Sequence, residues 1–418
     1  MLLEFLCSNH KSIREKVVFS AVASNDTTHL SELKTIPKTD IKVLKSAVIY
    51  GANGSGKSNF IDAIAFVKYL VLNSINNQPG GPILQTPHKI DGNSKESVYQ
   101  IHFTIDDIRY VYGFSLLNLL VSEEYLYYFP KGRQAKIFDR QGDEFTTGSR
   151  FRGKFNSCKD VLKLNRLLLS CAANFTAVEE IDKVFRFFRD DLIIYNSDNQ
   201  ENWMNYSLYQ INNDKKVKDT IISFMQSLGM GVKDIVVKID KKKMEQHEIP
   251  PFLSDEFKNI LLETQVDAIS ANVVYEKFST DLIHDESTGV KKLFGLLCPF
   301  LDIIINGKVL ICDELELGLH ESIVFELVRI FINAKYDKFA QIFFTTHETG
   351  ILNLDLFRRD QIWFTEMRME DRSTDLYSLS SFKNVRKDDN FGRGYILGKY
   401  GAIPMLNKDF ASLIIDSE

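Results

Sequence analysis

Short apolar and aromatic stretches separated by polar turn residues run through the first third of the chain, a pattern typical of short β-strands. Two of them, residues 2–6 and 17–22, flank a polar turn at residues 8–12. Turn signals separate four further stretches that are rich in aromatic residues: 98–103, 108–114, 123–128 and 135–138. An antiparallel sheet is therefore expected within residues 1–160. Its tyrosines are expected to pack across neighbouring strands, with a platform for stacked bases as the alternative.

The pattern becomes helical in the middle of the chain. Hydrophobic residues recur every three or four positions in three segments: 161–168, 181–188 and 217–224. Residues 232–239 are predicted to form a strand, and the lysine run 241–243 a solvated loop, with contact to phosphates as the alternative. We expect a mainly helical insertion over residues 161–285. Sustained heptads are missing, which argues against long coiled-coil arms.

The last third, residues 286–418, alternates apolar runs with amphipathic helices. An unbroken apolar run at 309–312 is typical of a buried parallel strand, and a second mainly apolar strand is predicted at 341–344. Helical spacing is found at 293–304 and 323–331, and two more strand patterns follow at 361–364 and 376–379. The expected fold class is α/β: a mixed sheet assembled from both ends of the chain, with an antiparallel β subdomain and a helical insertion.

Glycine concentrates in one segment between the apolar run 48–50 and a helical pattern. Its residues are Gly51, Ala52, Asn53, Gly54, Ser55, Gly56, Lys57, Ser58 and Asn59. Glycines at this spacing let backbone N–H groups turn inward around a phosphate chain, while Lys57 reaches the β- and γ-phosphates and the Ser58 hydroxyl binds Mg²⁺. The following helix points its positive end at the phosphates. A chance glycine-rich turn is the alternative, but the strand–loop–helix context favours a phosphate-binding loop.

A second group of polar residues follows the apolar strands of the last third. Asp313 and Glu314 come directly after the run 309–312, and His347 follows the run 341–344. Downstream of a phosphate loop, paired acids at the end of a buried strand predict that Asp313 binds Mg²⁺ and that Glu314 is the general base for the attacking water. A structural carboxylate pair is the alternative. No N-K-x-D motif for reading guanine is visible, so ATP is the expected nucleotide.

A predicted helix start precedes the strand 309–312, which with Asp313 and Glu314 has the form of a Walker B motif. It contains Ser287 and Gly289, followed by Lys291 and Lys292 in the first turn. Lysines at that end oppose the helix dipole, and an anion docked there would relieve the opposition. An ordinary N-cap is the alternative.

These motifs together resemble the ABC-class ATPase heads of the SMC, RecF and OLD group. The matching segments are the N-terminal strand pair, the loop 51–59, the E-S-T-G-V-K-K segment 286–292, the D-E-L-E-L-G-L-H segment 313–320 and the T-T-H segment 345–347. The tail Y-I-L-G-K-Y-G-A-I-P at 395–404 is similar to that of bacterial abortive-infection ATPases of the AbiL and RloA kind. Only the helical middle is unmatched. A Q-loop glutamine is not apparent, with Gln85 and Gln100 as candidates.

The resemblance implies a division into an N-terminal ATPase lobe (1–160), an insertion (161–285) and a C-terminal ATPase lobe (286–418). It implies that His347 senses the γ-phosphate, and that Ser287 and Gly289 complete the nucleotide site of a partner chain, so that ATP closes a homodimer or a higher homo-oligomer. The implied role is antiphage defence, in which the ATPase senses infection and controls a separate toxic effector encoded beside it, a nuclease being one candidate.

Two other functions share the same head. A RecF- or SMC-like ATPase would act on DNA in repair or recombination. An OLD-type nuclease would need a TOPRIM domain, for which the 71 residues after His347 leave too little room.

Composition bears on nucleic-acid binding, on disulfide and zinc sites, and on membrane contact. Lys and Arg number 51 against 56 Asp and Glu, and the net charge of −5 does not favour non-specific coating of nucleic acid, although a local basic groove fits the same average. The five cysteines contain no C-x-x-C pair, so neither a disulfide framework nor a zinc site is expected. No apolar run approaches the ~18 residues of a membrane span. We expect a cytoplasmic protein with no membrane contact.

Overall fold

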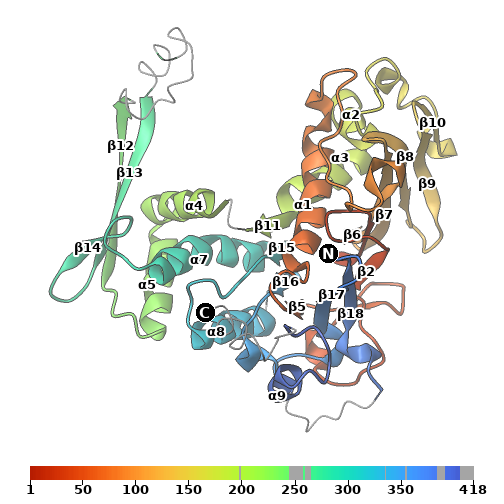
Figure 1. Ribbon diagram of the computed structural model, residues 1–418. Helices are drawn as coiled ribbons and strands as arrows, with labels where there is room; N and C mark the ends of the chain where they lie inside the picture. Colours follow the sequence, from red (N-terminus) through yellow and green to blue (C-terminus); the bar gives the residue numbers. More distant parts are fainter. Residues whose placement is uncertain are drawn as a thin grey trace, which may run out of the picture. The chain divides into compact units, whose positions relative to one another are not determined.

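The computed structural model describes residues 1–196, 199–243, 258, 265–334, 336–353, 355–383 and 391–404. The chain divides into two compact units (Figure 1). Unit 1 comprises Met1–Asn196, Ile303–Glu316 and Val324–Glu418, and unit 2 comprises Ser197–Asp302 and Leu317–Ile323. Unit 1 therefore draws on both ends of the chain.

An antiparallel sheet forms one side of unit 1. In the described part of the chain its strand order is β10-β9-β8-β7-β6-β1-β2. The strands are β1 (Leu2–Ser8), β2 (Val17–Ser20), β6 (Ser97–Ile105), β7 (Ile108–Leu117), β8 (Leu120–Tyr128), β9 (Ala135–Gln141) and β10 (Glu144–Thr147). All strands predicted for the first third are present. Tyr110 stacks on Tyr128 with ring centroids 6.1 Å apart, the cross-strand packing that was expected.

The second sheet of unit 1 is mixed, with the order β11-β15-β16-β5-β17-β18 among the described residues. Its strands are β5 (Ser46–Gly51), β11 (Leu192–Tyr195), β15 (Val309–Cys312), β16 (Gln341–Thr345), β17 (Ile362–Met367) and β18 (Thr374–Ser378). Of the pairings between described residues of this sheet, only that of β17 with β18 is antiparallel. A strand from the first third thus lies between strands from the last third, which confirms the predicted fold class.

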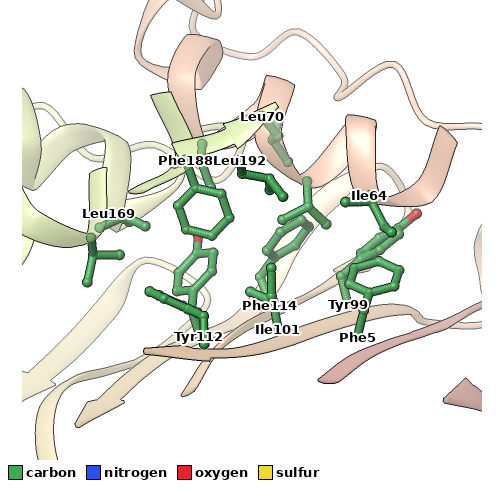
Figure 2. Close-up of a cluster of buried hydrophobic side chains, with 14 of the residues drawn as sticks. Phe5, Ile64, Leu70, Tyr99, Ile101, Tyr112, Phe114, Leu169, Phe188 and Leu192 are labelled. Atoms are coloured by element: carbon green, nitrogen blue, oxygen red, sulfur yellow. The ribbon is translucent and has the colours of Figure 1, made fainter. Parts of the chain in front are cut away.

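Helix α1 (Lys57–Asn73) joins the two sheets through one core. It buries the predicted apolar stripe: Phe60, Ala63, Ile64, Val67, Leu70 and Val71. Figure 2 shows Ile64 and Leu70 facing Phe5, Tyr99 and Phe114 of the antiparallel sheet. The helices α2 (Leu168–Phe175) and α3 (Glu179–Arg186) and the π-helical turn Phe187–Asp191 extend this core. The phosphate loop therefore leads into a helix that is rigidly packed along its length.

Residues 161–196 belong to unit 1, although the sequence pattern placed them in the insertion that begins at 161. Residues 161–167 are not helical despite their spacing. The reason is a buried ion pair, because the Arg140 guanidinium lies 3.1 Å from Glu124 and also bonds two backbone carbonyls of this segment. The Glu124 carboxylate accepts the first two N–H groups of α2. These bonds hold the segment in a series of turns against β8 and β9.

Unit 2 combines helices with a small antiparallel sheet. Its described elements include α4 (Gln200–Asn213), α5 (Lys215–Ser227), β12 (Asp234–Lys243), β13 (Gln265–Val274), β14 (Ser279–Asp281) and the start of α7 (Thr288–Asn306). The run 241–243 lies in β12 and not in a loop, because pairing with β13 continues to Lys243 opposite Gln265. These lysines are exposed, as expected. Helix α8 (Glu321–Asn333) covers the pattern predicted at 323–331.

All five cysteines are buried free thiols, in agreement with the absence of a disulfide framework: Cys7, Cys158, Cys171, Cys298 and Cys312. A search of the helices in the described residues found none that is both long enough and apolar enough to cross a bilayer.

Candidate nucleotide-binding site

The predicted site residues of unit 1 arise at one edge of the mixed sheet. Strands β15, β16 and β5 are parallel neighbours, with Cys312 opposite Phe344 and Thr345 opposite Ile49. Their carboxyl ends therefore meet, and this is the edge at which open α/β sheets bind ligands. The phosphate loop follows β5, Asp313 follows β15 and His347 lies just after β16.

The phosphate loop is held from behind by the last two strands of the sheet. Gly56 has φ +104°, and a Cβ there would lie 2.0 Å from Thr374 Oγ1, so only glycine fits. Thr374 donates to the Ser55 carbonyl at 2.9 Å, and the Ser55 and Thr365 hydroxyls are 2.7 Å apart. Sequence reasoning did not find Thr365 or Thr374, since neither carries a signal beyond its place at the end of a strand pattern.

The turn between β1 and β2 contacts the start of α1. Asn59 Nδ2 donates to Ser12 Oγ at 2.7 Å, and Ser12 Oγ is also 2.7 Å from Thr374 Oγ1. His10 Nε2 and Lys11 Nζ lie 2.9 and 2.8 Å from the carboxylate of Asp62 in α1. The N-terminal strand pair is thus fastened to the first turns of the helix that carries the loop.

The two Q-loop candidates differ in their surroundings. Gln85 Nε2 donates to the Asn9 carbonyl at 2.9 Å, which places Gln85 against the β1–β2 turn. Gln100 lies in β6 and accepts a hydrogen bond from the Tyr125 hydroxyl at 2.5 Å. Of the two candidates, Gln85 is therefore the one that contacts the β1–β2 turn, which in turn contacts the start of α1.

Lys57 is folded onto its own loop. Its ammonium donates to the carbonyls of Gly51 at 2.8 Å and Ala52 at 3.2 Å. Burial lowers the pKa of Lys57 to about 8, against the opposing effect of the carboxylates of Asp313, Glu316 and Glu314. A buried cation among loop amides fits a polyphosphate, whose negative charge would compensate the cost of burial.

The two acids after β15 are tied to the end of β16 through Thr345. The Thr345 hydroxyl donates to Asp313 Oδ1 at 2.6 Å and accepts the Glu314 N–H at 2.8 Å. Glu314 has φ +48°, which is uncommon for a residue other than glycine and costs about 1–3 kcal/mol. The bonds to Thr345 hold this turn, so the neighbouring strand fixes the Asp313 carboxylate and the backbone of Glu314.

His347 lies within electrostatic range of the same groups. Its backbone N–H donates to Glu316 Oε1 at 2.7 Å, and its side chain is exposed. Burial, followed by the Lys57 charge, lowers the pKa of His347, while the carboxylates of Glu316, Glu314 and Asp313 oppose the shift. The shift favours the neutral form of the imidazole.

The donor set suits Mg²⁺. Ser58 presents an exposed hydroxyl in the first turn of α1, and Asp313 presents a carboxylate after β15. Within the described residues no three His, Cys, Asp or Glu side chains gather into a metal site. Mg²⁺ prefers oxygen ligands and is usually held by one or two protein groups together with substrate phosphates, so Ser58 and Asp313 fit this ion.

Ser287 and Gly289 belong to unit 2, whereas the loop and Walker B residues belong to unit 1. Ser287 Oγ accepts the Val290 N–H at 3.3 Å and caps α7. A Cβ on Gly289 would lie 2.3 Å from the Gly318 carbonyl oxygen, so this glycine allows a close contact with the segment after Walker B.

The C-terminal motif 395–404 packs beneath the phosphate loop. Tyr395, in α9 (Phe391–Ile396), and Tyr400 both stack on Phe364 of β17, with ring centroids 5.7 and 5.9 Å away. Tyr395 also contacts Tyr50, the residue before the loop. A cavity of about 270 Å³ lies between the loop and the tail, lined by Ala52, Asn53, Gly54, Ser55, Thr365, Glu366, Met367, Met369, Arg372, Ala402, Ile403 and Pro404.

Comparison with solved structures found SMC head domains. The head bound to the C-winged helix domain of ScpA is 16% identical, with a TM-score of 0.45 and coverage of 90% of this chain and 97% of that one. The SMC head domain from Thermotoga maritima is 13% identical, with a TM-score of 0.37 and coverage of 90% and 98%. The head with a coiled coil and joint from Pyrococcus yayanosii is 12% identical, with a TM-score of 0.39 and coverage of 95% and 99%.

A comparison with curated proteins found no match. A family model does match, over residues 46–154 and 180–353, which is more than half of the chain. The matched residues include the phosphate loop, the Walker B acids and His347. The chain belongs to the P-loop ATPase family described as "AAA domain, putative AbiEii toxin, Type IV TA system".

Proposed function

We propose that this chain is a Mg²⁺-dependent ATP hydrolase whose turnover drives the closing and opening of paired ATPase units. The observation that carries the proposal is the meeting of Lys57, Asp313, Glu314 and His347 at one sheet edge, where the carboxylates act to raise the pKa of both basic side chains. Phosphoryl transfer needs these groups: a cation and amides for the phosphates, a metal ligand and a base.

Each residue has a separate task in this mechanism. The amides of the loop 51–59 and Lys57 bind the phosphates, and Ser58 and Asp313 would hold Mg²⁺, which neutralises phosphate charge when bound. Glu314 orients a water and accepts its proton. His347, exposed at the same sheet edge, would contact the γ-phosphate and report whether it is present.

Two variants test this assignment. Lys57→Ala is expected to lose ATP binding, because the loop loses its cation. Glu314→Gln is expected to bind ATP with little change and to lose turnover by a factor of about 10²–10⁴, the usual contribution of a general base. Binding is measured with a fluorescent ATP analogue and turnover by phosphate release. Turnover by Glu314→Gln at the unmodified rate would show that another group is the base.

The site is proposed to be completed by a second chain. Ser287 and Gly289 start a helix in unit 2, away from the sequence that forms the loop, and two lysines follow in its first turn. A helix start with this charge suits the γ-phosphate of a partner's ATP. ATP would then bridge two chains into a homodimer, or into a higher homo-oligomer.

The biological role proposed is antiphage defence by abortive infection. The family description, which refers to the AbiEii toxin and a type IV toxin–antitoxin system, supports a setting in which growth is arrested. We propose that this chain senses infection and controls a separate effector encoded beside it. A nuclease is one candidate for that effector. Unit 2 offers the surface that would hold the effector.

Phage challenge with this gene alone, with its neighbour, and with both genes in a Lys57→Ala background tests the role. Protection is expected only when both genes and an intact Lys57 are present. Full protection by this chain alone would contradict the proposal of a separate effector. A several-fold rise of the ATPase rate with duplex DNA, without protection in any arm, would instead favour an ATPase that acts on DNA.

A further inference from the structure

Glu316 has no task in the mechanism above, yet it lies among the groups that do. Its Oε1 accepts the backbone N–H of His347 at 2.7 Å. Its Oε2 is buried and has no hydrogen-bond partner among the described residues. A buried polar atom without a partner is costly, so its presence in a folded protein calls for a reason.

The direction of the His347 side chain depends on its backbone. Within the described residues no hydrogen bond of the imidazole ring is present, and the side chain is exposed. The backbone is held by three consecutive N–H groups: Thr346 to the Ile49 carbonyl at 3.2 Å, His347 to Glu316 at 2.7 Å, and Glu348 to Thr346 Oγ1 at 3.1 Å. The middle bond is the one that acts on His347 itself.

The same bond completes a junction between the two catalytic segments. Thr345 already binds the turn after β15 through Asp313, Glu314 and the Leu315 N–H, the last at 3.2 Å from the Thr345 carbonyl. Glu316, two residues after Glu314, adds a bond from the same turn to His347, two residues after Thr345. Hydrogen bonds therefore connect that turn with both Thr345 and His347.

We propose that Glu316 is a positioning residue, which fixes His347 relative to Asp313 and Glu314 by accepting its backbone N–H. The inference rests on the proposed ATP hydrolysis. Glu316 acts as a hydrogen-bond acceptor and transfers no proton. The alternative is that Glu316 is the general base. Glutamine could still accept the His347 N–H, but it could not accept a proton from the attacking water.

The first test compares Glu316→Gln with Glu316→Ala in steady-state turnover. Glutamine keeps a carbonyl oxygen for the His347 N–H, so kcat is expected to stay within about threefold of the unmodified value, whereas alanine is expected to lower kcat about 10- to 100-fold with KM for ATP within about threefold. A loss with glutamine as large as with alanine would overturn the positioning role, since it would show that the charge is required.

The second test is a double-mutant cycle with His347→Ala. Because Glu316 acts through His347, adding Glu316→Ala to His347→Ala is expected to cause no further loss of kcat. Additive losses would overturn the inference. Glu321→Ala, which removes an exposed carboxylate nearby in sequence, is the matched control and is expected to leave turnover unchanged.

Thermal unfolding and ATP binding of each variant separate a local effect from loss of the fold. The outcome for the proposed function is read separately, in the unmodified protein. Absence of turnover there would refute ATP hydrolysis itself, whereas normal turnover combined with additive losses in the cycle would refute only the role of Glu316.

Discussion

Lys57 carries its charge in surroundings that disfavour it, and this has a consequence for nucleotide binding. Burial lowers its pKa to about 8, so the free protein loses the ammonium proton as the pH rises through that value. The phosphates of bound ATP favour the charged form and hold the proton. Above about pH 8, binding must therefore take up a proton, and affinity falls.

The expected result is a Kd for ATP that rises roughly 20-fold between about pH 7.5 and about pH 9.5, following the single proton. Titration of a fluorescent ATP analogue across this range measures it. Lys68→Met is the matched control, because burial also lowers the pKa of Lys68 to about 8, but its ammonium donates to the Leu192 carbonyl and not to the loop. The control is expected to keep the pH dependence, and a flat profile in the unmodified protein would contradict the assignment to Lys57.

At the scale of elements, the phosphate loop depends on strands that contribute no group to the chemistry. Thr365 of β17 and Thr374 at the start of β18 hold the loop. The tail aromatics stack on Phe364 of β17, whose side chain alternates with that of Thr365. In the same way, the Glu124–Arg140 pair fastens β8 and β9 to the start of α2. Each element is positioned by polar bonds to a partner that is distant in sequence.

The buried pair provides a prediction at this scale. Both side chains are 0% exposed, so removing one leaves an uncompensated buried charge. Arg140→Met is expected to lower the free energy of unfolding by about 3–5 kcal/mol, and adding Glu124→Gln is expected to recover part of that loss. Denaturant titration measures both. Arg189→Met, which breaks the exposed pair with Asp190, is the control and is expected to have no measurable effect; an equal effect in both proteins would contradict the argument.

At the scale of the whole molecule, the proposed dimer predicts that two inactive variants complement each other. Lys57→Ala lacks a functional loop but keeps Ser287, whereas Ser287→Ala keeps its loop. In a mixed dimer, one composite site contains only intact parts. Mixing the two in equal amounts is expected to restore about a quarter of the unmodified turnover, since half of the dimers are mixed and each has one complete site.

Phosphate release in mixtures, compared with each variant alone, measures this complementation. Ser287→Ala is preferred over a change at Gly289, because a side chain there would collide with the Gly318 carbonyl within unit 2 and disturb the fold. Turnover of the mixture no greater than the average of the two variants, at concentrations where dimers form, would indicate that each chain works alone.

The sequence by itself determined those elements that are specified by residues close together in the chain. Spacing within a few residues predicts the loop 51–59 and the helix after it. Short apolar or aromatic runs between turn residues predict the strands of the first third and the strands before Asp313 and His347. Such patterns specify backbone geometry directly, because the glycines, the apolar stripe and the strand ends are consecutive. The fold class and the main site candidates could be predicted for this reason.

Tertiary structure alone decided what holds those elements in place. Thr365 and Thr374 meet Ser55 across 310 and 319 residues of sequence, and Glu316 meets His347 across 31. Residues 161–167 are not helical, and Arg140 donates hydrogen bonds to two of their backbone carbonyls. The lysines at 241–243 are part of a strand because they pair with β13. A hydrogen bond between distant residues leaves no periodic signal in the chain, so these contacts exist only once the strands are side by side.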